Sequence, residues 1–250
     1  MIPNLYENPS SADLRQEVWQ LRKLLKGILS CSGVDADSRQ IAAPTVPLDS
    51  GKWPCIEADF PWPHADHYNM RGFQDVRKYR NHSPYDTLTA RALLEFSASE
   101  INRLAPPEIG ALWMWTTKDF EGLALACMAL AGFHKKQTFV WVKTSEPDAP
   151  EPSPSMGMGH WGRNSHELLF YGVRPKFRGK YLTPMAGRTT LRNVIYARPE
   201  GHSRKPDLFY EIIRANSPGP CLSLFQRTMR AGWTCWGNEI PGGVGQKEDI

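Results

Sequence analysis

The chain has 250 residues, of which 41% are hydrophobic and 22% are charged. This ordinary globular composition can bury a sufficient core, and one large domain is favoured over two small ones. The net charge of +4 is only mildly basic, so a preference for polyanions has to come from local clusters of cations.

The cysteines and the hydropathy pattern exclude several classes of protein. Five cysteines are scattered along the chain without a Cys-x-x-Cys pair, which argues against a disulfide framework and a zinc cluster and favours reduced thiols. No run of about 18 apolar residues occurs, and the N-terminus does not resemble a signal peptide. We therefore expect a soluble, cytoplasmic protein without a membrane partner.

Residues 11–28 predict an amphipathic helix, because apolar residues recur at helical spacing with charges between them. These residues are Leu14, Val18, Leu21, Leu25 and Ile28. The apolar stripe fits either packing on the main domain or binding of a partner, and both interpretations stay open. The small, polar and proline-containing residues 31–52 predict a linker.

Short apolar runs and helical patterns alternate along the centre of the chain. Strands are predicted over 54–56, 110–115, 137–142, 167–173, 193–197 and 221–225, and helices over 85–104, 118–132 and 206–216. The buried stripe of the second helix is predicted to be Leu123, Ala126, Cys127 and Leu130. Such alternation predicts the α/β class with a mostly parallel sheet.

The stretch Glu57-Ala58-Asp59-Phe60-Pro61-Trp62 follows the first apolar run. It combines an acid, a turn stiffened by proline and a large aromatic. Open α/β sheets hold ligands beyond the carboxyl ends of their strands, so this position suits an active site. An ordinary strand exit, with Trp62 covering the core, fits the same residues, and the pattern alone does not separate the two.

Residues 63–86 predict a long polar loop, which is typical of functional or disordered segments. His64, Asp66 and His67 lie close together in this loop. They lack a fourth ligand at a recognised spacing, so we predict no metal site.

The segment 156–162 contains glycines in the pattern G-x-G-x-x-G. It is not a dinucleotide fingerprint, because it follows a loop rich in Pro and Ser and precedes a strand instead of a helix. We expect a flexible loop that lets His160 and Trp161 approach a planar ligand.

Residues 174–192 contain basic side chains and no acid. The basic residues are Arg174, Lys176, Arg178, Lys180, Arg188 and Arg192, and Phe177 and Tyr181 lie among them. Clustered cations suit phosphates and aromatic rings can stack on unpaired bases, so this segment is the clearest indication of nucleic-acid binding. A solvated charged loop is the alternative.

Lys205 stands directly before the helix that begins at Pro206. Backbone N–H groups at a helix start and an ammonium group can together hold a carboxylate. A simple loop cation fits as well.

The motifs of this chain occur in a defined order. They are Asp-x-Pro-Trp at 59–62, Leu-Trp-Met-Trp at 112–115, Phe-Val-Trp-Val-Lys at 139–143, Gly-His-Trp at 159–161 with Glu-Leu-Leu-Phe-Tyr-Gly-Val at 167–173, His-Ser-Arg-Lys-Pro-Asp at 202–207, Leu-Phe-x-Arg at 224–227 and Gly-Trp-x-x-Trp-Gly-Asn-Glu at 232–239. This series, from about residue 53 to 240, resembles the MT-A70 family. Its members include the catalytic subunit of the messenger-RNA adenosine methyltransferase and DNA adenine methyltransferases of bacteria and phages.

The resemblance implies a Rossmann-like class I methyltransferase with helices on both faces of the sheet, using S-adenosylmethionine (SAM). The methyltransferase domain is then expected over 51–240. It follows the predicted helix and linker over 1–50, and the Gly-rich residues 241–250 predict a flexible tail. The family's Asp-Pro-Pro-Trp motif corresponds to Asp59, Phe60, Pro61 and Trp62. Asp59, Lys205, Arg227, Asn238 and Glu239 are then the expected SAM contacts, Lys205 with the methionine carboxylate and the last three with the ribose.

The expected reaction is methyl transfer to the exocyclic N(6) amine of adenine. Asp59 and the backbone carbonyl of residue 60 or 61 would accept the two amine hydrogens, and Trp62 would stack on a base that is single-stranded or flipped out. His160, Trp161, Arg174, Lys176, Arg178 and Lys180 are the predicted nucleic-acid contacts. The compact chain favours DNA as substrate. An RNA methyltransferase and a catalytically silent binding or scaffold relative are the alternatives, and a homo- or heterodimer stays open.

Two residues depart from the family's pattern. Phe60 replaces the first proline of the tetrapeptide, which adds an N–H and removes a fixed φ, so we expect a less rigid turn. Ser223 stands where the family often has an acid, which changes the expected electrostatics around the cofactor.

Overall fold

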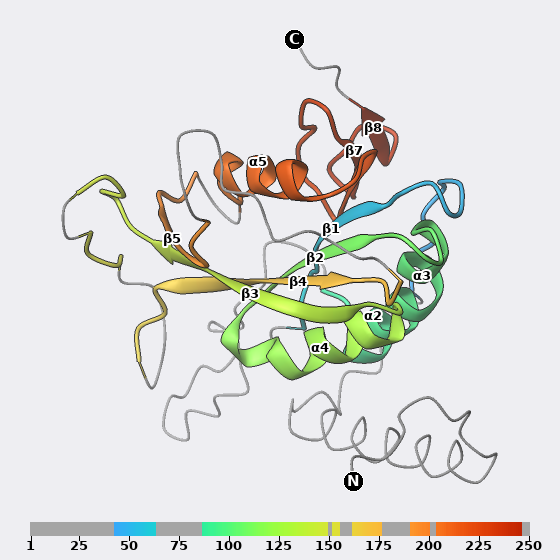
Figure 1. Cartoon of the computed structure of the whole chain (residues 1–250), viewed down its shortest axis with the longest axis horizontal. Coiled ribbons are helices and arrows are strands. Elements are labelled where there is room, and N and C mark those ends of the chain that lie inside the picture. Colours follow the sequence, from blue (N-terminus) through green and yellow to red (C-terminus); the bar gives the residue numbers. More distant parts are fainter. Residues whose placement is uncertain are drawn as a thin grey trace, which may run out of the picture. The chain divides into compact units, whose positions relative to one another are not determined.

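A computed structural model of the chain describes residues 43–63, 87–149, 152–155, 162–176, 191–200 and 204–246 (Figure 1). All of them belong to one compact unit of the chain, Ile41–Pro63 with His82–Ile250. The predicted helix over 11–28 and nearly all of the predicted loop over 63–86 lie outside the described residues. His160, Trp161, Arg178, Lys180 and Arg188 lie outside them too.

The described residues form an eight-stranded sheet. Its strands are β1 (Cys55–Asp59), β2 (Ala111–Thr116), β3 (His134–Lys143), β4 (His166–Val173), β5 (Val194–Ala197), β6 (Cys221–Leu224), β7 (Thr234–Trp236) and β8 (Val244–Gln246). Their spatial order is β5-β3-β4-β2-β1-β6-β7-β8. Strands β2, β1, β6 and β7 run parallel to one another, and β5 runs parallel to β3. The predicted α/β class with a mostly parallel sheet is confirmed.

Strand β4 is the exception inside the sheet, because it runs antiparallel to both of its neighbours, β2 and β3. A parallel connection needs a crossover, usually a helix, and the described residues between β3 and β4 form only turns and loops. Strand β8 pairs antiparallel with β7, so the sheet extends into the stretch predicted as a tail.

The predicted helix over 85–104 is observed as three consecutive segments, α2 (Ala90–Phe96), a π-helical turn η1 (Ser97–Ile101) and α3 (Asn102–Leu104). It begins later than predicted because Thr89 caps it, accepting a hydrogen bond from the Ala92 N–H at 3.1 Å. The next helical segment starts with a 3₁₀ turn, η2 (Lys118–Phe120), and continues as α4 (Glu121–Leu130). None of the helices in the described part of the chain is both long and apolar enough to cross a membrane.

Helices cover both faces of the sheet, with α5 (Asp207–Asn216) on one face and α2 and α4 on the other (Figure 1). All residues of β2 are buried, as expected for a strand covered on both sides. Trp113 and Trp115 pack in one core cluster with Phe209 and Ile213 of α5. The sheet is thus closed on both faces, and its accessible functional edge is the one where the parallel strands end.

The buried face of α4 differs from the prediction in part. Leu123 and Cys127 are buried as predicted, together with Ala124 and Met128. Ala126 is half-buried and Leu130 is exposed, because both lie to one side of the face that these four residues bury.

Candidate active site

Strand β1 carries two acids on the face of the sheet that α5 covers. Side chains alternate along a strand, so Glu57 and Asp59 point the same way. Glu57 is fully buried in the middle of β1, whereas the side chain of Asp59, at the carboxyl end, is 24% exposed. Asp59 therefore lies at the edge where parallel α/β sheets hold ligands.

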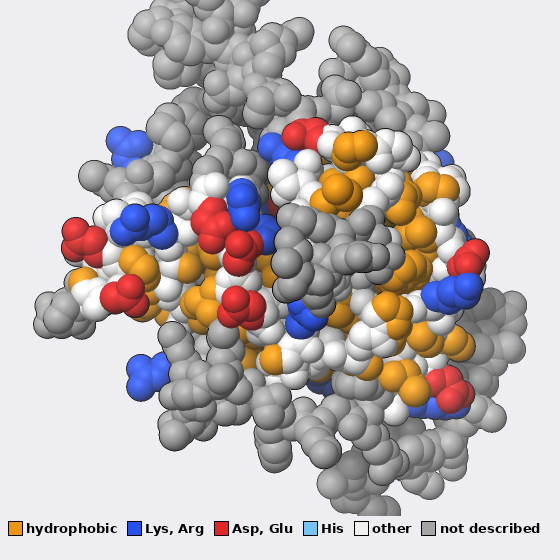
Figure 2. All heavy atoms as spheres, turned by 90° about the horizontal axis from the view of Figure 1, so that it is seen from above, with side chains coloured by type: hydrophobic (Ala, Val, Ile, Leu, Met, Phe, Trp, Pro, Cys, Tyr) orange, Lys and Arg blue, Asp and Glu red, His pale blue; other side chains and the backbone are white. Residues whose placement is uncertain are grey.

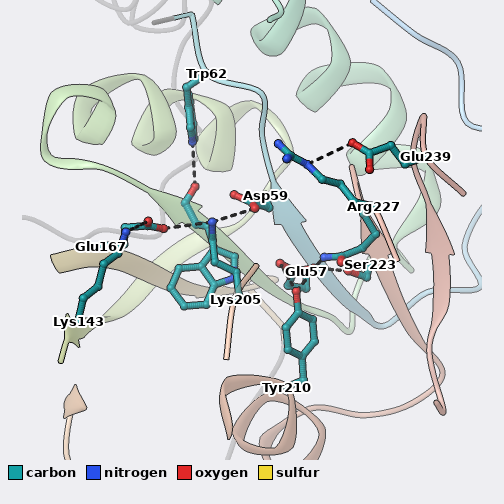
Figure 3. A network of polar contacts seen from close by, with 12 residues as sticks. Glu57, Asp59, Trp62, Lys143, Glu167, Lys205, Tyr210, Ser223, Arg227 and Glu239 are labelled. Carbon is teal, nitrogen blue, oxygen red and sulfur yellow. Dashed lines mark hydrogen bonds and ion pairs between the residues drawn. The ribbon is translucent and has the colours of Figure 1, made fainter. Parts of the chain in front are cut away.

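Asp59 is the first of four side chains of alternating charge that pair in series (Figure 3). The Nζ of Lys205, just before α5, lies 2.9 Å from Oδ2 of Asp59 and 3.1 Å from Oε2 of Glu167. Oε1 of Glu167 lies 2.5 Å from the Nζ of Lys143. Asp59 and Lys205 were predicted from the sequence, whereas Glu167 and Lys143 were not. The only signal for these two is one charge at the end of an apolar strand.

The protonation of this series follows from its burial and its pairing. Burial raises the pKa of Asp59, and the nearby ammonium of Lys205 offsets only part of this effect. Burial also disfavours the charged form of Glu167, but Lys205 and Lys143 hold its pKa at about 2. The two carboxylates raise the pKa of Lys205 although burial acts against its charge. Of the two acids in this series, Asp59 is therefore the one whose charged form is less stabilised, since its pKa is raised and that of Glu167 is lowered.

Glu57 forms a separate polar network directly behind Asp59. Its Oε2 accepts hydrogen bonds from the hydroxyl of Ser223 and, at 3.1 Å, from the amide of Gln226. Its Oε1 accepts from the hydroxyl of Tyr210 at 3.4 Å. Burial, with a contribution from the charge of Asp59, raises the pKa of Glu57 to about 7, although the Ser223 hydrogen bond and the charges of Arg230 and Lys205 act in the opposite direction.

Glu57 places a carboxyl group beside Ser223, where the family's pattern often has an acid. Glu57 and Ser223 are register partners on the adjacent parallel strands β1 and β6. A carboxyl group therefore reaches this position from the neighbouring strand. This role of Glu57 was not predicted from the sequence, although an acid within a buried apolar strand is a usable signal.

The remaining predicted SAM contacts follow β6 and β7, the parallel strands next to β1. The Nε of Arg227 lies 3.7 Å from Oε1 of Glu239, whose side chain is 59% exposed, and Asn238 is exposed as well. Arg227 also contributes to the electrostatic environment of Asp59. The structure thus brings Asp59, Lys205, Arg227 and Glu239 to one edge of the sheet (Figure 3).

Phe60 is held by packing in a cluster of aromatic rings. Its side chain is 3% exposed, and its ring centroid lies 5.3 Å from Trp62, 6.0 Å from Phe96 and 5.3 Å from Phe225. The Trp62 N–H donates to the Phe60 carbonyl at 2.9 Å. Packing of the ring and this hydrogen bond hold the turn at a position where the expected proline would restrict φ.

Trp62 is 4% exposed, and its ring stacks on Phe120 with centroids 5.5 Å apart. Its indole N–H donates to the carbonyl of Trp115 at 3.2 Å. One face of the ring is thus covered by Phe120. Stacking of Trp62 on a base stays a prediction.

The prediction that Arg174 contacts nucleic acid does not fit its buried position, because its guanidinium is used inside the fold. It donates to the carbonyl of Ala131 at 2.7 Å and to the carbonyl of Asn102 at 2.8 Å, and it lies over the ring of Phe133. Gly132, at φ +79°, leaves the room for it, since a Cβ there would collide with Arg174. Arg174 therefore ties together the ends of α3 and α4.

Lys176 is exposed and pairs with Glu108. Its position is compatible with the predicted contact to nucleic acid, which stays a prediction. Within the described ranges, no three His, Cys, Asp or Glu side chains form a group that could hold a metal ion. The prediction that the protein uses no metal is not tested by this observation.

Residues 54–239 match the family model MT-A70. The chain belongs to the MT-A70 family. The matched segment runs from the start of β1 to the turn after β7 and so contains the whole charged edge described above. The resemblance stated from the order of motifs is confirmed, and with it the Rossmann-like methyltransferase fold.

Curated relatives in the MT-A70 family are similar to part of this chain. The METTL3 catalytic subunit of a human N(6)-adenosine-methyltransferase is 27% identical over 198 residues, 77% of this chain and 29% of that protein. A probable N(6)-adenosine-methyltransferase from Oryza sativa is 29% identical over 136 residues, 53% of this chain and 18% of that protein. The N6-methyladenosine RNA methyltransferase MTA1 of Cryphonectria parasitica is 25% identical over 225 residues, 86% of this chain and 58% of that protein.

The chain spans less than two thirds of each of these relatives. Their names refer to adenosine and, for the Cryphonectria protein, to RNA. They do not support DNA, which the compact chain had favoured as substrate.

Proposed function

We propose that this MT-A70 protein is a SAM-dependent methyltransferase that acts on the N(6) amine of adenine in RNA. The observation that carries the proposal is the partly exposed carboxylate of Asp59, at the carboxyl end of β1 and 2.9 Å from the ammonium of Lys205. RNA replaces DNA as the proposed substrate because the relatives are named for adenosine and RNA.

The side chains at this edge fit the polar groups of SAM, which supplies a methyl group already activated on a sulfonium. Lys205 and Arg227 can donate to its carboxylate and its hydroxyl oxygens. Asp59, Asn238 and Glu239 can accept from its ammonium and its ribose hydroxyls. Asp59 ends β1, and Arg227, Asn238 and Glu239 follow the neighbouring parallel strands β6 and β7. Lys205 precedes α5 and pairs with Asp59 at the same edge. Lys205 already binds two carboxylates here, so its contact with SAM would add to these ion pairs.

The contribution of the protein to the chemistry is to position the amine. Its lone pair is delocalised into the ring, and an acceptor for each N–H would favour the more tetrahedral, partly positive nitrogen of the transition state. Asp59 would accept one hydrogen. The carbonyls of Phe60 and Pro61 already accept from Trp62 and Leu88 in the chain, and each retains a second lone pair for the other hydrogen.

Binding of the RNA requires an adenine outside a base stack and cations for the flanking phosphates. Figure 2 shows Lys and Arg side chains scattered over the face it draws, several of them next to acidic ones. Lys176 is one such paired cation. Lys176 remains accessible, because its side chain is exposed. The proposed RNA contacts are Lys176 and the predicted residues His160, Trp161, Arg178 and Lys180.

The test uses RNA and DNA oligonucleotides of the same sequence, tritiated SAM and mass spectrometry of the nucleosides. We expect N(6)-methyladenosine from RNA with the parent protein and none with Asp59→Ala. Asp49→Ala, which removes an exposed acid paired with Lys52, is the control and should keep the parent rate. Failure of the parent to methylate either polymer would favour the silent relative, and a faster reaction with DNA would overturn the choice of RNA.

A further inference from the structure

Glu57 is a fully buried acid that takes no part in the proposed chemistry. Its two carboxylate oxygens accept from three side chains, the hydroxyls of Ser223 and Tyr210 and the amide of Gln226. The hydroxyls of Ser223 and Tyr210 can donate to a charged Glu57 or accept from a protonated one, so these partners can bind either form of the carboxyl group. Burial of a charged side chain lowers the free energy of unfolding, so we expect this network to have a role beyond stability.

Gln226 is the member of the network that reaches the cofactor edge. Its amide donates to Glu57 and also lies 2.8 Å from the hydroxyl of Tyr210. Its backbone N–H donates to the carbonyl of Trp236 at 2.9 Å. Gly237 packs so closely on the backbone of Gln226 that a Cβ there would collide with it.

The loops after β6 and β7 therefore meet at Gln226. Arg227 is the next residue of the first loop, and Asn238 and Glu239 directly follow Gly237 in the second. A rotation of Gln226 would move both loops together, because its backbone touches one and its chain continues into the other. Glu57 and Tyr210 prevent this rotation by holding its side chain.

We propose that Glu57 is a positioning residue that acts through Gln226 and holds Arg227, Asn238 and Glu239 in the arrangement that binds SAM. This inference rests on the proposed function of the same site. Glu57 itself lies behind the site and touches none of the reacting atoms.

The register of β1 and β6 offers a specific way to test this role. Ser223 lies opposite Glu57 on the adjacent strand, so the double variant Glu57→Ala with Ser223→Glu moves the carboxyl group across the strand pair. The hydroxyl of Ser223 and the amide of Gln226 donate to the same carboxylate oxygen of Glu57. A carboxyl group on residue 223 therefore starts close to this amide.

The experiment is isothermal titration of each variant with SAM, followed by steady-state kinetics with RNA. Glu57→Ala should weaken SAM binding by about tenfold, as for the loss of a hydrogen bond to a charged group. The double variant should recover most of this loss. Gln226→Met should match Glu57→Ala, and the two together should be no weaker than either alone, because they remove one interaction.

The kinetics separate positioning from general destabilisation. Loss of positioning raises the KM for SAM and leaves kcat at saturating SAM nearly unchanged, whereas partial unfolding lowers kcat at constant KM. Ser97→Ala, which removes a buried hydroxyl that donates to Leu93 in α2, is the matched control and should leave the KM unchanged. If Glu57→Ala does not fold, the nearly isosteric Glu57→Gln replaces it.

The outcomes for the inference and for the proposed function are distinct. If the parent binds SAM and Glu57→Ala and Gln226→Met bind it equally well, the inference is overturned and the proposed function stands. If the parent itself gives no heat with SAM, the proposed function fails.

Discussion

The ammonium of Lys205 lies 2.9 Å from the carboxylate of Asp59 and joins the residue before α5 to the end of β1. The same ammonium binds Glu167 at 3.1 Å, at the start of β4. Three segments far apart in the sequence therefore meet at one buried cation, which is 6% exposed.

Lys205→Met should be strongly destabilising, because it leaves the carboxylates of Asp59 and Glu167 facing each other without a cation. Breaking a buried ion pair typically costs about 3–5 kcal/mol. Urea denaturation will measure this loss. Lys176→Met removes an exposed pair and should change the free energy of unfolding by less than about 1 kcal/mol. Equal effects of the two substitutions would contradict the structural role of Lys205.

The rate of methyl transfer should fall on the acid side as Asp59 becomes protonated. Because burial raises the pKa of this carboxyl above 3.8, the fall should begin at a higher pH than for an exposed aspartate. Asp59→Asn should lower kcat by roughly 10²–10³-fold and remove this acid limb from the residual rate. Single-turnover rates between pH 4 and 8 will test both. An unchanged acid limb in the variant would assign the titration to another group.

Glu57 should make the protein less stable as the pH rises. Its pKa is about 7 in the folded protein against an ordinary 4.5, so the folded state binds the proton more tightly. The stabilising contribution of the proton is complete below pH 4.5 and disappears as the pH rises through about 7. At about 1.4 kcal/mol per pKa unit, the change amounts to at most about 3.5 kcal/mol.

Glu57→Gln does not titrate, so its free energy of unfolding should lack this decrease between pH 5 and 8. Urea denaturation at a series of pH values will compare it with the parent, and Ser97→Ala should follow the parent. Parallel profiles for the parent and Glu57→Gln would show that Glu57 stays charged throughout.

Arg174→Met should reduce stability without changing RNA affinity. It removes a guanidinium that donates to the Ala131 and Asn102 carbonyls, and hydrogen bonds of charged groups contribute about 1.5–3 kcal/mol each. Chemical denaturation and fluorescence anisotropy with labelled RNA will measure the two effects. The exposed Lys176 is the comparison, because Lys176→Met should leave stability nearly unchanged and make RNA binding less dependent on salt. Weaker RNA binding by folded Arg174→Met would instead support the prediction from the sequence that Arg174 contacts nucleic acid.

Phe60→Pro introduces the family's proline but should destabilise the protein. It removes a ring packed among Trp62, Phe96 and Phe225, and deletion of a buried phenyl group costs about 3–5 kcal/mol. Phe60→Leu keeps most of the volume and should cost less than about 1.5 kcal/mol. Thermal unfolding will rank the variants. Equal stability of Phe60→Pro and the parent would show that packing of the ring does not hold this turn.

The local pattern of the sequence was sufficient for the fold class and for much of the active edge. Apolar runs and helical periodicity predict the elements, because each depends on side chains close together in the chain. The acid and aromatic turn after the first apolar run predicts the position of Asp59, since parallel strands end at a common edge. The order of the motifs indicated the family, which the match over residues 54–239 confirms.

Only the tertiary structure decided which distant side chains meet. Arg174 and Lys176 look alike in a basic stretch, but the first is buried against two helix ends and the second is exposed. Glu57 and Ser223 become partners only because β1 and β6 are neighbours in register. Strand β4 runs antiparallel to β2, so the start of β4 lies next to the carboxyl end of β2, at the active edge. For this reason Glu167, at the start of β4, can pair with Lys205. Strand order and register arise from packing over the whole chain, so no local pattern specifies these contacts.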